Sequence, residues 1–145
     1  MMGQGALAIR SFDAADTEAV IALWRACGLV RPWNDPHKDI ARKLTAQPEL
    51  FLVACVDGFT VGSAMVGFDG HRGWVYYLAV APEMQRRRIG RALIERAEEL
   101  LLERGCPKFC LMVRRENTAV LDFYRELGFA QDDTVVLGKR LISDL

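Results

Sequence analysis

Residues 73–99 read GWVYYLAVAPEMQRRRIGRALIERAEE, and this stretch decides the fold. Its first part, Trp74 to Val80, is an unbroken run of aromatic and aliphatic residues, which predicts a strand buried on both faces. Pro82 ends the strand because proline has no N–H to give to a sheet. Its last part, extended to Glu103, has apolar residues at helical spacing and stops before Gly105, which predicts a helix from residue 89.

The loop between this strand and this helix carries four arginines: Arg86, Arg87, Arg88 and Arg91. A helix start offers unpaired backbone N–H groups and the positive end of the helix dipole, and a strand-to-helix loop can aim those groups at a phosphate. The alternative is an ordinary solvated run of charge. The position of the run between a buried strand and a helix start, rather than on a tail, favours an anion site.

Two motifs in this order resemble those of the Gcn5-related N-acetyltransferase (GNAT) family. The family pattern Gln/Arg-x-x-Gly-x-Gly/Ala, placed after a strand that ends in Val-x-Pro, is matched by Gln85-Arg86-Arg87-Arg88-Ile89-Gly90-Arg91-Ala92. About thirty residues further on, the family's second signature is matched by NTAVLDFYRELGF at residues 117–129. The resemblance covers nearly the whole chain. Arg88 stands where the family has its middle glycine, a residue that lets the backbone approach a ligand closely.

The rest of the chain predicts the order of elements that this family has. Strands are expected at about residues 6–12, 50–56, 60–68, 109–113, 129–132 and 135–141, and helices at about 13–27, 36–46 and 117–127. We therefore expect a single domain over residues 1–145 of the α/β (α+β) class, with a mixed, mostly antiparallel sheet of six to seven strands and helices on both faces. The resemblance adds a splay between strands 4 and 5.

The resemblance implies that acetyl-CoA is the acetyl donor and lies in this splay, and it implies no metal. It places pantetheine against the backbone of the fourth strand, one N–H of which would face the thioester oxygen, and the pyrophosphate in the basic loop. Asn117 corresponds to a residue that contacts the CoA arm, although an asparagine there could also be a plain helix N-cap. The residues expected at the cofactor are Leu78, Ala79, Val80, Gln85, Arg86, Arg87, Arg88, Ile89, Gly90, Arg91, Ala92, Asn117 and Tyr124.

Tyr124 corresponds to the general acid of the family, which protonates the leaving thiolate of CoA. A phenol with a pKa near 10 can donate to a thiolate with a pKa of about 8.5 when the two are held together. The alternative is an aromatic side chain on a helix face, packed beside Leu121 and Leu127.

The general base stays open. In the branch of the family that acetylates N-terminal alanines, a glutamate five residues before the motif asparagine removes the proton, and this position is Met112 here. The remaining candidates, acting directly or through water, are Asp69, His71, Glu83 and Glu116.

The acceptor pocket is expected at two loops that also resemble those of a small bacterial subfamily of uncharacterised acetyltransferases. These loops mix aromatic and polar side chains, and binding residues concentrate in loops. We expect Trp33, Asn34, Asp35 and His71 to shape this pocket, with a purely structural turn around Trp33 as the alternative.

The composition limits the class of partner. The chain has 145 residues, 51% of them hydrophobic, and its 19 basic residues balance 19 acidic ones, so it lacks the basic excess of a nucleic-acid binder. No apolar run is long enough to span a bilayer, and four scattered cysteines are typical of reduced thiols in the cytoplasm. Within these limits, the resemblance implies an N-acetyltransferase that acts on a small-molecule or protein amine by direct attack in a ternary complex. The alternative is a non-catalytic acyl-CoA sensor, and the apolar final strands would allow a homodimer.

Overall fold

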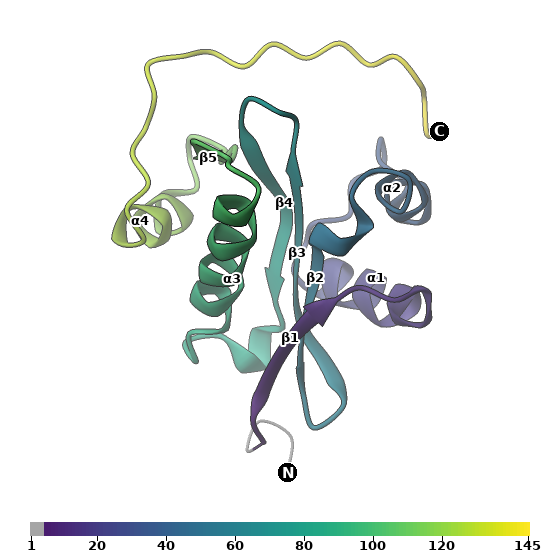
Figure 1. The fold of residues 1–145 in the computed structure, drawn as a ribbon. Helices are drawn as coiled ribbons and strands as arrows, with labels where there is room; N and C mark the ends of the chain where they lie inside the picture. The colour runs from purple at the N-terminus through teal and green to yellow at the C-terminus, as the bar shows by residue number, and fades with distance from the viewer. Residues whose placement is uncertain (1–4) are drawn as a thin grey trace.

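The computed structural model describes residues 5–145, and this part of the chain forms one five-stranded sheet in the order β1-β2-β3-β4-β5 (Figure 1). The first four strands are antiparallel to their neighbours, and β5 runs parallel to β4. The mixed, mostly antiparallel sheet is thus confirmed. The strands are β1 (Leu7–Ser11), β2 (Phe51–Val56), β3 (Phe59–Phe68), β4 (Gly73–Val80) and β5 (Phe109–Cys110).

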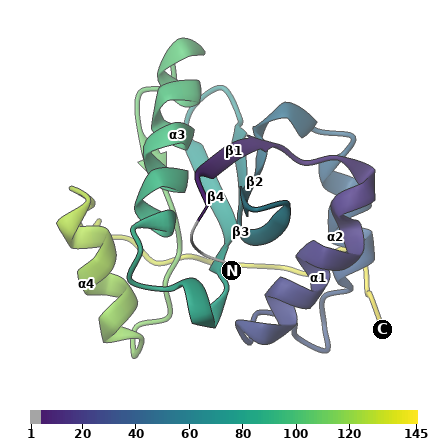
Figure 2. The same ribbon diagram turned by 90° about the horizontal axis from the view of Figure 1, so that it is seen from below.

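Helices cover both faces of the sheet, as the sequence predicts (Figure 2). Helices α1 and α2 lie on one face, α3 covers the other, and α4 lies beside α3. Short 3-10 turns precede α1, β2 and α3. The helices are α1 (Thr17–Ala26), α2 (Pro36–Lys43), α3 (Ile89–Glu103) and α4 (Thr118–Glu126). Within residues 5–145, no helix combines the length and the apolar character needed to cross a membrane.

The local signals in the sequence have direct physical counterparts. Asp13 and Asp16 form a reciprocal capping box before α1, and the carboxylate of Asp35 accepts backbone hydrogen bonds at the start of α2. Asp57 and Gly58 both have positive φ, as the tight turn of the β2–β3 hairpin requires. These caps and turns fix where each apolar stripe meets the sheet.

The core has two layers that meet the sheet from opposite sides. Trp24 of α1 is fully buried and stacks on Phe51 of β2, while Leu93 and Ile94 of α3 are fully buried against the other face. Burying side chains of this size contributes about 1.5–3 kcal/mol each. The sheet is therefore held rigidly in its first four strands, which are the strands that position β4.

The expectation that β4 is buried on both faces is wrong in its middle. Tyr76 is 46% exposed, and Tyr77 and Leu78 are only partly buried. The reason lies in the sheet: β5 pairs with Gly73 and Trp74 alone, so among residues 5–145 no strand lies beside the rest of that edge of β4.

The predicted last strands are also wrong, as is the length of the fifth. β5 spans two residues rather than 109–113, and neither 129–132 nor 135–141 joins the sheet, so residues 5–145 have five strands instead of six to seven. The stretch 130–145 runs from α4 over the molecule to α2 as an extended, largely exposed chain (Figure 1). Alternation of apolar residues indicates a strand-like backbone, but a strand also needs a partner edge, and this stretch has none within the described chain.

Candidate active site

The site begins where β5 leaves β4. The two strands pair at Gly73–Phe109 and Trp74–Cys110 and then separate, which leaves a cavity of about 1010 Å³ that we call the fork cavity. It is lined by Leu78 from β4, Asn117 from the start of α4 and Tyr124 from within α4. The structure thus brings together three residues that lie up to 46 positions apart and that the sequence assigns to the acetyl donor.

A bulge in β4 sets the direction of the Leu78 amide. The β3–β4 register slips between Ser63 and Met65, and Tyr77, opposite the slip, has φ of 52°. The Ser63 hydroxyl donates to the carbonyl oxygen of Tyr77 over 2.8 Å. Because the C=O and N–H of a trans peptide point in opposite directions, the Leu78 N–H points away from Ser63, towards the side that β5 has left.

A buried network holds this bulge. The indole N–H of Trp24 donates to the Ser63 hydroxyl over 2.9 Å, and the ring of Trp24 stacks on that of Tyr77 with centroids 3.8 Å apart. The phenol of Tyr77 donates to the carboxylate of Asp39 over 2.7 Å. Burial, together with Asp39, raises the pKa of Tyr77, so this donor keeps its proton. Each hydroxyl and the indole N–H therefore has a partner, and the bulge has one defined geometry.

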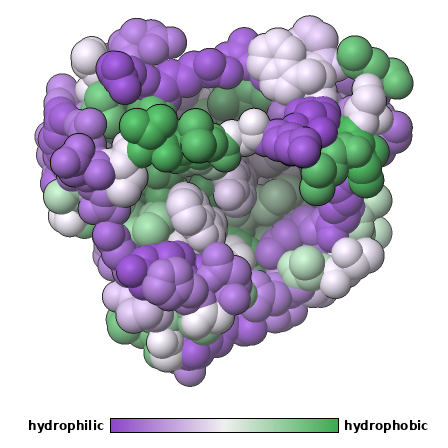
Figure 3. All heavy atoms as spheres, turned by 90° about the horizontal axis from the view of Figure 1, so that it is seen from above, coloured by the Kyte–Doolittle hydropathy of each residue, from purple (hydrophilic) through white to green (hydrophobic). Residues whose placement is uncertain are grey.

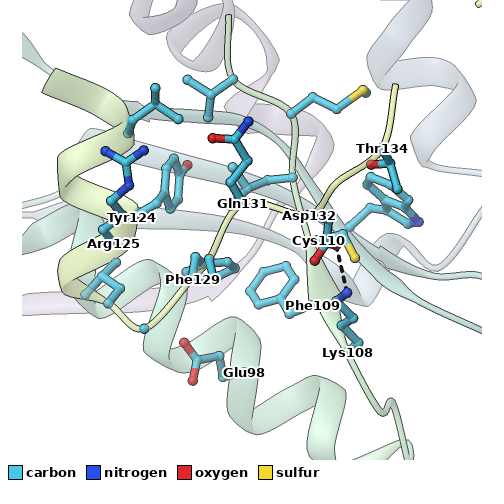
Figure 4. Close-up of a pocket in the computed structure, with 18 of the residues that line it drawn as sticks. Glu98, Lys108, Phe109, Cys110, Tyr124, Arg125, Phe129, Gln131, Asp132 and Thr134 are labelled. Carbon is cyan, nitrogen blue, oxygen red and sulfur yellow. Dashed lines mark hydrogen bonds and ion pairs between the residues drawn. The ribbon is translucent and has the colours of Figure 1, made fainter. Parts of the chain in front are cut away.

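Tyr124 is held from the opposite side of the fork. Its ring is buried and makes edge contacts with Phe123 and Phe129, at centroid distances of 5.0 and 5.4 Å. Burial raises its pKa, so the phenol is protonated at neutral pH, which is the form that a proton donor needs. Figure 4 shows Tyr124 reaching from α4 into the space between the helix and the 108–113 stretch.

Asn117 is the residue before α4, yet its side chain makes no capping hydrogen bond. The plain N-cap that the sequence leaves open is therefore not formed, and the side chain lies at the fork cavity instead. The carboxamide is available to a polar ligand there.

The basic loop has the backbone that a glycine would favour, although it contains none before Gly90. Arg86 has φ of 68° and Arg88 has φ of 61°, both in the left-handed region. Arg88 is the N-cap of α3, its side chain does not cap the helix, and the first turn holds no acidic residue. Within residues 5–145, neither the N-cap side chain nor a carboxylate of the first turn caps the N–H groups at the start of α3, and Arg86, Arg87 and Arg88 are exposed around them.

The remaining expected cofactor residues lie at the end of β4, in the basic loop and at the start of α3, outside the lining of the fork cavity. A Cβ on Gly90 would lie 3.3 Å from Phe123 and 3.6 Å from Val80, so the start of α3, the end of β4 and α4 meet closely at Gly90. The Val80 carbonyl accepts from the Gln85 carboxamide and the Cys27 thiol, each over 3.2 Å. Arg91 pairs with Glu95, one turn along α3. The residues of the loop and of the end of β4 that do not line the fork cavity are Ala79, Val80, Gln85, Arg86, Arg87, Arg88, Ile89, Gly90, Arg91 and Ala92.

Of the four candidate bases, Asp69 alone lines the fork cavity. Its carboxylate accepts from the backbone N–H groups of Arg72 and His71 and, more weakly, from the indole of Trp74 at 3.3 Å. These hydrogen bonds lower the pKa of Asp69, which makes it a weak base. Sequence reasoning missed Asp39, which also lines the cavity, because an acidic residue on an exposed helix gives no signal of what lies opposite it.

The four expected acceptor residues separate into two pairs. Trp33 and Asn34 line the fork cavity, and Trp33 is 48% exposed. Asp35 caps α2, and His71 lies exposed in the β3–β4 turn, so neither lines the cavity. The face of the molecule in Figure 3 is hollowed, and apolar residues gather in and around the hollow. Within residues 5–145, no three His, Cys, Asp or Glu side chains cluster as metal ligands would.

The sequence and the fold of this chain have counterparts among known proteins. The sequence profile of the acetyltransferase (GNAT) family matches residues 15–129. An acetyltransferase of Yersinia enterocolitica is 55% identical over 94% of this chain and 96% of its own. Among solved structures, the ribosomal-protein-S18-alanine N-acetyltransferase from Escherichia coli superposes with a TM-score of 0.74 at 25% identity, covering 88% of this chain and 79% of that one.

A second solved structure shares the fold at lower identity. AAC(6')-Iy, in complex with the bisubstrate analogue CoA-S-monomethyl-acetylneamine, superposes with a TM-score of 0.79 at 18% identity, covering 95% of this chain and all of that one. The profile match covers most of the chain, and the Yersinia relative matches it almost end to end. The chain therefore belongs to the GNAT family and is an acetyl-CoA-dependent N-acetyltransferase.

Proposed function

We propose that the protein transfers the acetyl group of acetyl-CoA to a primary amine by direct attack, with both substrates bound at the fork. One observation carries this proposal. The peptide that follows Tyr77 is turned by a buried serine so that the Leu78 N–H points into the fork, where the buried phenol of Tyr124 also lies. A hydrogen-bond donor and a proton donor on opposite walls are the two groups that acyl transfer from a thioester needs.

In the proposed reaction the amine lone pair attacks the thioester carbon, and the carbonyl oxygen gains negative charge. The Leu78 N–H donates to that oxygen, and a preorganised donor of this kind lowers the barrier by about 2.7–4 kcal/mol in other acyl-transfer enzymes. The C–S bond then breaks, and the Tyr124 phenol gives its proton to the thiolate. The nitrogen releases one proton to solvent as the amide forms, and a proton taken up from solvent restores the phenol. The raised pKa of Tyr124 makes proton loss more costly, so the transfer needs a thiolate that is desolvated to a similar degree.

We propose that the start of α3 holds the pyrophosphate of the donor. Neither its N-cap side chain nor a first-turn carboxylate caps its first N–H groups, and the loop before it has left-handed backbone at Arg86 and Arg88. Exposed arginines can add charged hydrogen bonds to the phosphate oxygens. The Asn117 carboxamide, free of a capping role, is proposed to contact the pantetheine arm.

The acceptor is proposed to enter the fork cavity past Trp33 and Asn34. Asp69 lies on the same cavity, where its carboxylate, held ionised by its hydrogen bonds, can attract an incoming ammonium group. We propose that the ammonium loses its proton through water, because Asp69 is too weak a base to remove it directly. Asp35 and His71 are proposed to support the loops rather than to touch the acceptor.

We also propose a cytoplasmic location. All four cysteines, Cys27, Cys55, Cys106 and Cys110, are free thiols. Cysteines that stay reduced are typical of a reducing compartment.

The direct test is turnover by the Tyr124→Phe variant with an amine panel of a lysine peptide, free amino acids, a polyamine and an amino sugar. We expect the wild type to release CoA with at least one amine, and the variant to lose about 10²–10⁴-fold in kcat, the usual contribution of a general acid. Acetyl-CoA affinity, measured by calorimetry, should stay within a few-fold because the ring remains. Unchanged kcat in the variant would contradict the role of Tyr124.

A further inference from the structure

The end of the chain reaches α2 and is bound there by a side-chain ion pair (Figure 1). The carboxylate of Asp144, which is fully covered, accepts two hydrogen bonds from the guanidinium of Arg42, over 2.6 and 3.2 Å. The same carboxylate accepts from the backbone N–H of Asp35, the residue that caps α2, over 2.9 Å. The last turn of α2 and the loop before it are thus joined through one side chain near the end of the chain.

Arg42 lies between Asp144 and a second carboxylate. Its Nη1 also donates to Oδ1 of Asp39 over 3.1 Å, and both Arg42 and Asp39 line the fork cavity. The other oxygen of Asp39, Oδ2, accepts from the Tyr77 phenol over 2.7 Å. A continuous series of hydrogen bonds therefore runs from the end of the chain to Tyr77, whose carbonyl is held by Ser63.

Asp144 determines how Arg42 shares its donors between the two carboxylates. An arginine commonly gives two parallel N–H bonds to one carboxylate, and this arrangement is a strong one. Arg42 makes this pair with Asp144 and contacts only one oxygen of Asp39, which leaves the second oxygen to Tyr77. Without the charge of Asp144, Arg42 can take both oxygens of Asp39, and the Tyr77 phenol then loses its acceptor.

We propose that Asp144 is a positioning residue for acetyl transfer. It engages Arg42, which keeps one oxygen of Asp39 available to the phenol. The phenol helps to hold Tyr77 in the bulge that directs the Leu78 N–H into the fork. Asp144 lies outside the lining of the fork cavity, so it acts through other side chains. The inference rests on the proposed function, in which the Leu78 N–H meets the thioester oxygen.

The first test is steady-state turnover of Asp144→Asn in the intact chain, with the amine that the wild type acetylates fastest. We expect kcat to fall about tenfold, less than the roughly 10²–10³-fold loss that follows removal of such a donor, and the acetyl-CoA KM to stay within about twofold. Asp144→Glu keeps the charge and should recover part of kcat. Asp133→Asn is the matched control, because this carboxylate is exposed on the same stretch and makes no hydrogen bond or ion pair within residues 5–145.

A double variant tests the route through Arg42. In Asp144→Asn the defect comes from the released arginine, so the additional substitution Arg42→Gln removes the competitor for Asp39. The double variant should therefore be no slower than Asp144→Asn alone. Losses in kcat that multiply would overturn the proposal, because Asp144 and Arg42 would then act independently.

Two backbone amides give a readout that does not need turnover. The Asp35 N–H loses its charged acceptor in Asp144→Asn, and the Leu78 N–H changes its surroundings. NMR should therefore show faster hydrogen exchange at Asp35 and a shifted Leu78 signal, with neither change in the control. A wild type that acetylates no amine would overturn the proposed function, and the catalytic role of Asp144 with it. Wild-type kcat in Asp144→Asn, or an unmoved Leu78 signal, would overturn this inference alone.

Discussion

The two sides of β4 are built in opposite ways. On the β3 side, the buried chain of Trp24, Ser63, Tyr77 and Asp39 gives every polar group a partner and fixes the bulge. On the β5 side, two residue pairs hold the strands together. Beyond them lie two cavities and the extended residues 130–145, which have no partner strand within residues 5–145. The rigid side orients the Leu78 amide, and the open side leaves room for ligands. Substitutions on the rigid side should therefore change stability more than substitutions on the open side.

The largest difference should appear between two tryptophans. Trp24→Ala empties a fully buried site on the rigid side and should lower the free energy of unfolding by about 3–5 kcal/mol. Trp33→Ala, at a half-exposed site on the open side, should cost less than about 1 kcal/mol. Urea unfolding followed by circular dichroism measures both. Equal losses would mean that the two sides are not built differently.

Ser63→Ala should affect both stability and turnover. It leaves the Trp24 indole N–H and the Tyr77 carbonyl without their partner in a buried place, which costs about 1–3 kcal/mol. The Leu78 amide should lose its fixed direction, so kcat should fall while the acetyl-CoA KM changes little, and Ser63→Thr should recover part of kcat. Ser11→Ala, which removes an exposed hydroxyl that donates to the Glu49 carbonyl, is the matched control. If kcat for Ser63→Ala matched that of the control, the serine would not orient the amide.

Two aspartates should respond differently to acid. Asp16, nearly buried, accepts from Arg10 and from the Asp13 N–H, and the hydrogen bond from Arg10 is the main cause of its lowered pKa. A lowered carboxyl pKa adds stability above the unfolded value near 3.9, and this stability is lost as the pH falls through the folded value. Asp16→Asn should therefore lower the free energy of unfolding at pH 7 by about 2 kcal/mol. Below pH 4 the free energy of unfolding of this variant should decrease less steeply with falling pH than that of the wild type.

Asp144 is the matched case on the open side. Its pKa is about 2 because Arg42 pairs with it, yet it anchors the extended residues 130–145, none of which belongs to the buried core. Asp144→Asn should therefore leave the unfolding midpoint nearly unchanged at pH 7. Chemical unfolding of Asp16→Asn and Asp144→Asn across pH 3–7 compares the two aspartates. A large loss of stability in Asp144→Asn would show that residues 130–145 unfold together with the core.

The smallest effect should come from the basic loop. Arg88 adopts a left-handed backbone, which costs a non-glycine residue about 1–2 kcal/mol, and glycine avoids most of this cost. Arg88→Gly should raise the free energy of unfolding by up to about 1 kcal/mol and keep acetyl-CoA binding. Gly90→Leu should weaken acetyl-CoA binding, because a side chain at residue 90 would collide with Phe123 and displace the start of α3. Thermal unfolding and calorimetry measure the two effects. A destabilised Arg88→Gly would show that the arginine side chain holds the loop.

The sequence predicted the part of the site that rests on local pattern. The run at 74–80 and the Asp57-Gly58 turn predicted β4 and the β2–β3 hairpin, and these predictions succeed because strand and turn signals act over a few residues. The roles of Leu78, Asn117 and Tyr124 came from the resemblance of the two motifs to the family; all three line the fork cavity, and their roles stay predictions.

Long-range pairings could not be predicted in the same way. Ser63 lies in an apolar run, where a small polar residue gives no sign of a role. Its role in holding the β4 bulge depends on a hydrogen bond from Trp24, 39 residues away. The prediction of the last two strands was wrong for the same reason. The apolar alternation at 135–141 correctly indicates an extended chain, but no local pattern indicates which strand edge, if any, would pair with it.

The central claim is that the fork beside the basic loop binds an acylated thiol carrier. Calorimetric titration of acetyl-CoA into the wild-type protein tests it most directly, after a cooperative thermal transition has shown that the sample is folded. We predict saturable heat with one site per chain and a dissociation constant of about 1 μM to 1 mM, the usual substrate range. A folded protein that gives no saturable heat with either acetyl-CoA or CoA would contradict the account.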